Sequence, residues 1–304
     1  MLERYKNSYL SYFLMYNFYY LSWAIFSALI SIYLLDKGFK ASEVSLVVST
    51  SFLTSMIFQP VIGMFSDRYD VKKVNFVLFT LAGIGGLAFM FASSLITITI
   101  GYSFVLTLIN GTNPVMEKIA SSSPYQYGKI RIWGTIGYAT GSWLAGMIYQ
   151  LISPSAIFIC FIITMILCII GLLGTQTPSE LGQNNEEKTK TSTLFHNYKY
   201  LYYLIIAAIF QGITNMANTY IPAMFQNDGL KVSLVSTILS FAVLCEAPLV
   251  LFSHKFMDKL TNKRLLIIAY SMITIQFLCY ALNVWLPLKV IITLQSILQV
   301  CYLL

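Results

Sequence analysis

Long apolar stretches alternate with short polar ones along the whole chain. The apolar stretches hold roughly twenty residues each, the length that an α-helix needs to cross a hydrocarbon layer of about 30 Å. Ten such runs cover residues 9–34, 44–65, 74–93, 95–115, 130–151, 155–174, 199–225, 232–253, 265–285 and 287–304. The pattern therefore predicts an all-α integral membrane protein that crosses the bilayer several times.

The overall composition supports a membrane location. Hydrophobic residues make up 57% of the 304 residues and charged residues only 10%. A soluble domain of this length would cover its core with charged helix faces, and this sequence lacks them. The first apolar run is too long and too aromatic for a cleaved signal peptide, so we expect it to remain in the mature protein.

The distribution of basic residues predicts the orientation in the membrane. If the N-terminus is cytoplasmic, the loops on that side carry most of the lysines and arginines, as the positive-inside rule requires. On the outer side are only Lys37, Lys40, Lys231 and Lys289. We therefore expect a multi-pass protein of the inner, cytoplasmic membrane. Topology and contact with anionic lipid then account for the net charge of +7, with no role for nucleic acid.

A polar segment at residues 175–198 interrupts the apolar pattern after the sixth run. It contains proline and charges of both signs, a composition typical of a linker. Six apolar runs precede it and four follow. We therefore expect an N-terminal bundle at 1–174, a cytoplasmic linker at 175–198 and a second bundle at 199–304.

The two predicted bundles share a repeated pattern of charge. Its members are Asp67, Arg68, Lys72 and Lys73 after the second run, and Asp258 and Lys259 after the eighth, at an offset of 191 residues. Independent enrichment of positive charge on the inner side is the alternative explanation. The repeat predicts a second bundle that would continue to about residue 365. We expect either a chain truncated at its C-terminal end or a ten-span variant, and the symmetry favours truncation.

The segment at 58–68 reads Phe-Gln-Pro-Val-Ile-Gly-Met-Phe-Ser-Asp-Arg. It resembles the loop signature of the major facilitator superfamily and, within it, the oligosaccharide:proton symporter family of lactose permeases. The resemblance implies a major facilitator fold with a six-helix N-terminal bundle and an incomplete C-terminal bundle of about four helices. It also implies a gating role for the residues of this signature and its repeat, which are Gly63, Asp67, Arg68, Lys72, Lys73, Asp258 and Lys259.

The segment at 127–139 is similar to the entry of the fifth helix in the same family. There an arginine and an aromatic ring seven residues later bind the sugar, and these positions are Arg131 and Tyr138 here. A guanidinium can bind hydroxyls through two donors, and an aromatic face can receive the less polar side of a sugar ring. The alternative is that Arg131 only reaches the membrane surface and Tyr138 only packs the bundle.

Several positions depart from the family pattern. The fourth-helix glutamate that pairs with the arginine aligns with Asn113, and Glu117 lies one helical turn further on. Glu117 could replace it, or could be a surface partner of Lys118. The seventh-helix acids appear as Asn215 and Asn218. The family's tenth-helix histidine and glutamate align with Ser296 and Gln299, so proton coupling through the family's own residues is in question.

One acid remains in the middle of a predicted span. Glu246 lies among apolar residues of the eighth run, where a carboxylate is costly and is by default a functional candidate. We expect it to bind solute, to carry a coupled proton, or both. The structural alternatives are a permanently protonated carboxyl bonded to a neighbouring helix and a hinge partner of Pro248.

The sequence thus predicts a secondary transporter, not an enzyme, that moves a small polar solute by alternating access. A sugar or oligosaccharide coupled to a proton is the leading expectation. The alternatives are a facilitator or exporter of a nucleoside, an aromatic acid or a drug, and an inactive fragment. We expect a monomer, and the sequence has no cofactor motif or cluster of metal ligands.

Overall fold

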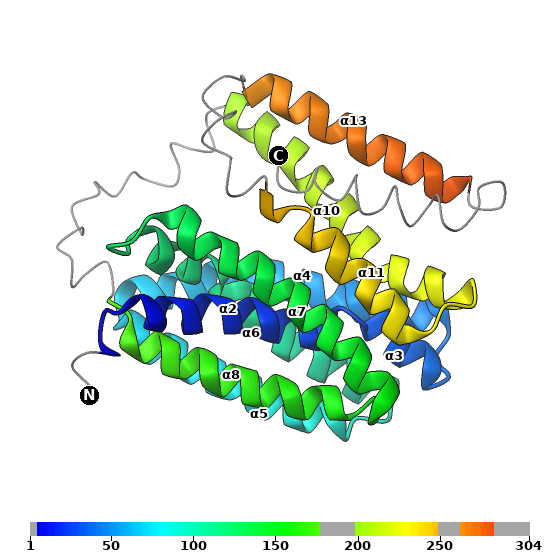
Figure 1. The fold of residues 1–304 in the computed structure, drawn as a ribbon, viewed down its shortest axis with the longest axis horizontal. Helices are drawn as coiled ribbons and strands as arrows, with labels where there is room; N and C mark the ends of the chain where they lie inside the picture. The colour runs from blue at the N-terminus through cyan, green and yellow to red at the C-terminus, as the bar shows by residue number, and fades with distance from the viewer. Residues whose placement is uncertain (1–4, 177–197, 249–261, 283–304) are drawn as a thin grey trace.

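The computed structural model describes residues 5–176, 198–248 and 262–282 (Figure 1). In the first part the helices are α2 (Tyr9–Ser27), α3 (Ile30–Asp36), α4 (Ala41–Arg68), α5 (Val71–Met90), α6 (Leu95–Ser121), α7 (Tyr127–Leu151) and α8 (Ala156–Gly174). In the second part they are α10 (Tyr198–Asn227), α11 (Val232–Leu244) and α13 (Asn262–Ala281). The prediction of an all-α membrane protein is confirmed, because seven helical stretches of the described part are long and apolar enough to cross a bilayer.

Local chemistry determines where several of these helices begin. Asp70 caps α5, and its side chain accepts hydrogen bonds from the backbone N–H groups of Lys72 and Lys73. At the start of α4 the Glu43 carboxylate accepts a 2.7 Å bond from the Lys40 backbone N–H. Asp70 therefore has a structural role in starting α5.

The eighth apolar run is not one continuous helix. We predicted a span at 232–253, but α11 ends at Leu244, and residues 249–253 lie outside the described part of the chain. Residues 245–246 form a turn, and Ala247 and Pro248 are helical again. Pro248 contributes to the interruption because it has no N–H to donate to the Leu244 carbonyl. The predicted run at 287–304 also lies outside the described residues.

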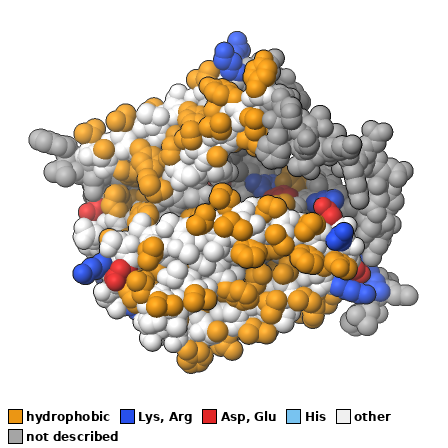
Figure 2. Space-filling view, turned by 180° about the vertical axis from the view of Figure 1, so that it is seen from behind, with side chains coloured by type: hydrophobic (Ala, Val, Ile, Leu, Met, Phe, Trp, Pro, Cys, Tyr) orange, Lys and Arg blue, Asp and Glu red, His pale blue; other side chains and the backbone are white. Residues whose placement is uncertain are grey.

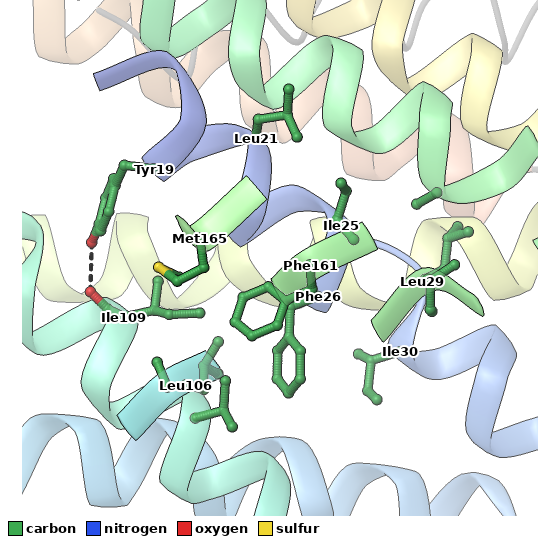
Figure 3. Packing of buried hydrophobic residues seen from close by; sticks show 14 of the residues in the cluster. Tyr19, Leu21, Ile25, Phe26, Leu29, Ile30, Leu106, Ile109, Phe161 and Met165 are labelled. Atoms are coloured by element: carbon green, nitrogen blue, oxygen red, sulfur yellow. Dashed lines mark hydrogen bonds between the residues drawn. The ribbon is translucent and has the colours of Figure 1, made fainter. Parts of the chain in front are cut away.

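The first six predicted spans form a bundle in which α2 is flanked by α7 and α8 (Figure 1). In the same bundle α4 packs along α6, and α5 packs against α6 and α8. The interior is aromatic and aliphatic. Figure 3 shows Phe26 beside Phe161, and the Tyr19 hydroxyl donating to the Ile109 carbonyl at 2.5 Å.

Glycine allows α7 and α8 to approach the backbone of α2. A Cβ added at Gly137 would lie 2.3 Å from the Asn17 carbonyl oxygen, and one added at Gly171 would lie 2.1 Å from the Met15 nitrogen. No side chain fits into such a gap. Small residues at helix crossings are a common way to bring membrane helices together.

The helices of the second part contact the first bundle mainly through α11, which packs along α7, and through α10, which packs against α3. A Cβ added at Gly146 on α7 would lie 1.8 Å from the Ser236 hydroxyl oxygen on α11. α13 packs against α10, where the Tyr270 hydroxyl donates to the Ile206 carbonyl.

Candidate solute-binding site

An ion pair joins the end of α6 to the start of α7. The Nη1 atom of Arg131 lies 2.7 Å from the Oε1 atom of Glu117, and their side chains are only 32% and 27% exposed. We considered a surface pair of Glu117 with Lys118. Lys118 instead lies 3.5 Å from Asp67, and Glu117 turns to Arg131.

Three tyrosines donate hydrogen bonds to the same carboxylate. Tyr16 and Tyr20 of α2 each donate to its Oε1 atom at 2.7 Å, and Tyr127 of α7 donates to Oε2 at 2.6 Å. Arg131 also donates to the oxygens of Tyr16 and Tyr20, at 3.1 and 3.4 Å. Bonds of this kind to an ionised group are stronger than those between neutral groups. The charged pair is therefore held in place from α2, α6 and α7.

Sequence reasoning missed these tyrosines, although a signal was present. Tyr16 and Tyr20 are spaced i, i+4, so they share one face of a helix. In an apolar run such residues are typical of core packing, and only the fold brings their hydroxyls to Glu117. Asn113 lies one turn before Glu117 on α6 and belongs to the same group. Its side-chain amide donates a 3.4 Å hydrogen bond to the Tyr20 hydroxyl oxygen.

Aromatic rings extend the site along α2 and α7. Trp23 stacks against Tyr20 with ring centroids 5.8 Å apart and meets the edge of Tyr138 at 6.4 Å. The predicted residues Arg131 and Tyr138 thus belong to one continuous surface of polar groups and rings. Trp23 is a further member that the sequence did not single out.

Glu246 is buried, with 8% of its surface exposed, and follows the end of α11. It lies within electrostatic range of the Tyr138 hydroxyl. The carboxylate therefore interacts electrostatically with the tyrosine that the family resemblance assigns to solute binding.

The two predicted asparagines of α10, Asn215 and Asn218, lie apart from the hydrogen bonds around Glu117. The Asn215 side chain donates to the Gln211 carbonyl of its own helix at 2.8 Å. Asn218 is half-buried on the same helix. Among the described residues, neither forms a hydrogen bond with the Glu117 group.

The predicted gating residues lie at the junction of α4 and α5. Asp67, with a 74% exposed side chain, forms the ion pair with Lys118 that joins α4 to α6. Arg68 ends α4, and the backbones of Lys72 and Lys73 are bound by Asp70. Nothing lies within 4 Å of a Cβ added at Gly63, so packing among the described residues does not require glycine there. The repeat members Asp258 and Lys259, like Ser296 and Gln299, lie outside the described residues.

A second polar cluster connects the first bundle to α10. Both oxygens of Asp36, at the end of α3, accept hydrogen bonds: one from the Tyr149 hydroxyl at 2.5 Å and one from the Gln226 amide at 3.1 Å. Further bonds between the two parts run from Ser31 to the Thr219 carbonyl and from the Ser233 backbone to Gln150.

Figure 2 shows a hollow in the face opposite that of Figure 1, with acidic and basic side chains visible inside it. Two cavities lie beside α4 and are separate from the predicted binding residues. They measure about 460 Å³ and 330 Å³, and none of the predicted binding residues lines them.

Comparison with known proteins identifies the family that the chain resembles. The profile of the Major Facilitator Superfamily matches residues 12–303. The uncharacterized transporter YwbF of Bacillus subtilis (strain 168) is 25% identical over 81% of this chain, and the chain spans 63% of its length. The raffinose permease of Escherichia coli is 21% identical over 88% of the chain and 69% of its own length. The probable 3-phenylpropionic acid transporter of E. coli (strain K12) is 21% identical over 83% of this chain and 68% of its own length.

Solved structures show the same fold. A mutant of the nucleoside transporter NupG superposes with a TM-score of 0.79 at 17% identity, over 96% of this chain and 78% of that one. A D-xylose-proton symporter superposes with a TM-score of 0.65 at 15% identity, over 96% of this chain and 77% of that one. The fold predicted from the loop signature is confirmed by these likenesses.

Proposed function

The chain belongs to the Major Facilitator Superfamily of transporters, and from this premise we propose that it moves a small polar solute across a membrane by alternating access. It is a multi-pass membrane protein, and its relatives are transporters, not enzymes. We further propose that it acts in the cytoplasmic membrane as a monomer, with its N-terminus inside.

The proposed solute is a sugar or oligosaccharide. The observation that carries this assignment is the Arg131–Glu117 pair, bound by tyrosines and continued by the rings of Trp23 and Tyr138. Hydroxyl groups need both donors and acceptors, and the apolar face of a sugar ring can pack against an aromatic ring. Relatives named as raffinose, sucrose and maltose permeases support the same class.

In the proposed movement, the binding site opens in turn at the outer end and at the inner end of the molecule. Residues 1–174 form one unit, 199–304 belong to the other, and 175–198 connect them. The bonds of Asp36 and the close contact of Gly146 with Ser236 would close the outer end. The Asp67–Lys118 pair lies within the first unit and would hold Asp67 at the inner end. An exposed ion pair of little net stability can break and free Asp67 for a gate contact with the second unit.

We propose Glu246 as the carrier of a coupled proton. A buried carboxyl close to the solute can exchange a proton as the surrounding cavity opens and closes. Its burial and its nearness to Tyr138 support this role.

A second candidate solute is a nucleoside. The stacked pair of Tyr20 and Trp23 favours it, because a flat base packs on such rings more completely than a sugar does.

Counterflow uptake tests the proposal. Proteoliposomes loaded with unlabelled solute would be supplied with labelled raffinose or labelled uridine, with protein-free vesicles as control. Accumulation of raffinose is the expected result. Accumulation of uridine alone would select the second candidate, and uptake of neither would count against both.

A further inference from the structure

We propose that Glu117 excludes anionic solutes from the binding site, and that removing its charge converts the same site into one that accepts carboxylates. The inference rests on the proposed function, because it takes Arg131 as a donor to the solute. The inference goes beyond that function because it states that the site selects solutes by charge. Neutral sugars and nucleosides would bind, and aromatic acids would be excluded.

Arg131 already has its counter-ion. Its Nη1 atom lies 2.7 Å from a Glu117 oxygen in a setting that is about two-thirds buried for both side chains. A carboxylate solute that approached Arg131 would have to lie beside the charge of Glu117. Repulsion between like charges is larger in a partly buried site than in water, because solvent screens it less.

The tyrosines add to this selection. Each phenol has one O–H group, and those of Tyr16, Tyr20 and Tyr127 are already donated to Glu117. Toward a solute these phenols can act only as acceptors, through the lone pairs that Arg131 and Asn113 leave unoccupied. A neutral hydroxyl can donate to such an oxygen and can accept from Arg131, whereas a carboxylate can only accept.

Within the residues that the structure describes, Arg131 is the only base that forms an ion pair with Glu117. The two charges of the pair cancel. The pair therefore offers an anion no uncompensated positive group.

Replacing Glu117 by glutamine should reverse the preference. Glutamine keeps the length of the side chain, and its one oxygen can still accept from Tyr16 and Tyr20, while its NH2 group can donate to the Tyr127 oxygen. It leaves Arg131 without a counter-ion. A solute carboxylate can then take that place. We expect the affinity for carboxylates relative to matched neutral solutes to rise by about tenfold or more, the usual effect of one charge-assisted hydrogen bond.

The experiment compares two matched pairs of solutes that differ only in charge. The pairs are methyl galactoside with methyl galacturonate, and 3-phenylpropanol with 3-phenylpropionate. Binding to the purified full chain in lipid nanodiscs would be measured by isothermal titration. The wild-type protein should prefer the neutral member of the pair it binds, and Glu117→Gln should shift that preference toward the acid.

Glu43→Gln is the matched control. It removes the same charge at the start of α4, where glutamine can keep the bond to the Lys40 backbone N–H, and it should keep the wild-type preference. A double variant, Glu117→Gln with Arg131→Gln, should lose the gain for acids, because that gain depends on the uncompensated guanidinium.

A wild-type preference for either acid would overturn the proposal without any variant. So would a Glu117→Gln protein that binds the neutral solute but shows no gain for its acid. A wild-type protein that binds neither sugar and prefers 3-phenylpropanol to 3-phenylpropionate would contradict the sugar assignment. The same result would support the exclusion of anions by Glu117. Binding of none of the four solutes by either protein would count against both.

Discussion

The Tyr149 hydroxyl lies 2.5 Å from a carboxylate oxygen of Asp36, and this bond fastens the end of α7 to the end of α3. The other oxygen of the same carboxylate accepts from Gln226 of α10. One acidic side chain thus connects two helices of the first bundle to the second part of the chain. In a transporter with alternating access, such a connection must break when this end opens.

Replacing Asp36 by alanine should make this end open more often. The variant loses two bonds to a charged group, and either is worth enough to change a two-state population about tenfold. The readout is a cysteine at Ser236, which is fully buried against α7, in a background without the native cysteines. Labelling by a membrane-impermeant maleimide should be several times faster in the Asp36→Ala protein. Equal rates would mean that Asp36 does not hold this end closed.

Two glycines on different helices should respond in opposite ways to the same substitution. Gly137→Ala would bring a methyl group to 2.3 Å from the Asn17 carbonyl oxygen, and the forced separation of α7 from α2 should cost about 1–3 kcal/mol. Gly63→Ala meets open space and should leave stability unchanged or slightly raised. Thermal unfolding in detergent measures both. A Gly63→Ala protein that is stable but does not transport would support the gating role of Gly63.

The sequence singled out Arg131, Tyr138 and Glu117 as candidates, but not the hydrogen bonds that join Glu117 to Arg131 and the tyrosines. Arg131 and Tyr138 were identifiable because the resemblance fixed their register on one helix. Glu117 was ambiguous, since a helix end offers a carboxylate both surface and interior partners, and only the packing of α2 against α7 selects Arg131. Tyr16 and Tyr20 could not be distinguished from core residues for the same reason.

The break after α11 shows the opposite case, in which the sequence contains a local signal for the interruption. Pro248 lies four residues after Leu244 and removes the hydrogen bond that would continue the helix. Apolar residues on both sides of Glu246 keep the average hydropathy of the run high, so apolarity alone predicts a single span there.

Arg131 should be sensitive even to a substitution that keeps its charge. Lysine cannot reproduce a planar group that binds Glu117 and still has further donors for a solute. Arg131→Lys should therefore lower the affinity for the transported solute by about tenfold or more in equilibrium binding. Lys129→Arg, two residues away, is the control and should bind normally. Unchanged affinity in a folded Arg131→Lys protein would mean that Arg131 serves only as a structural partner.

The predicted topology can be tested at the linker. A cysteine introduced at Asn184, in a background without native cysteines, should be labelled in inside-out vesicles and protected in intact cells. The expected result follows from the excess of basic residues on that side of the membrane. Ready labelling from outside would invert the whole orientation, and with it the assignment of inner and outer gates.

Glu246→Gln should separate the coupling of transport from the binding of solute. Glutamine keeps the hydrogen-bonding shape of the buried side chain near Tyr138 but cannot take up or release a proton. If Glu246 carries the coupled proton, the variant should lose uphill accumulation driven by an imposed pH gradient while it still exchanges labelled for unlabelled solute. If Glu246 only binds solute, both activities should fall together. Both assays use the same proteoliposomes, so a poorly folded protein is recognised by its low reconstitution. Normal uphill transport by Glu246→Gln would remove Glu246 from the mechanism and would require another group to carry the proton.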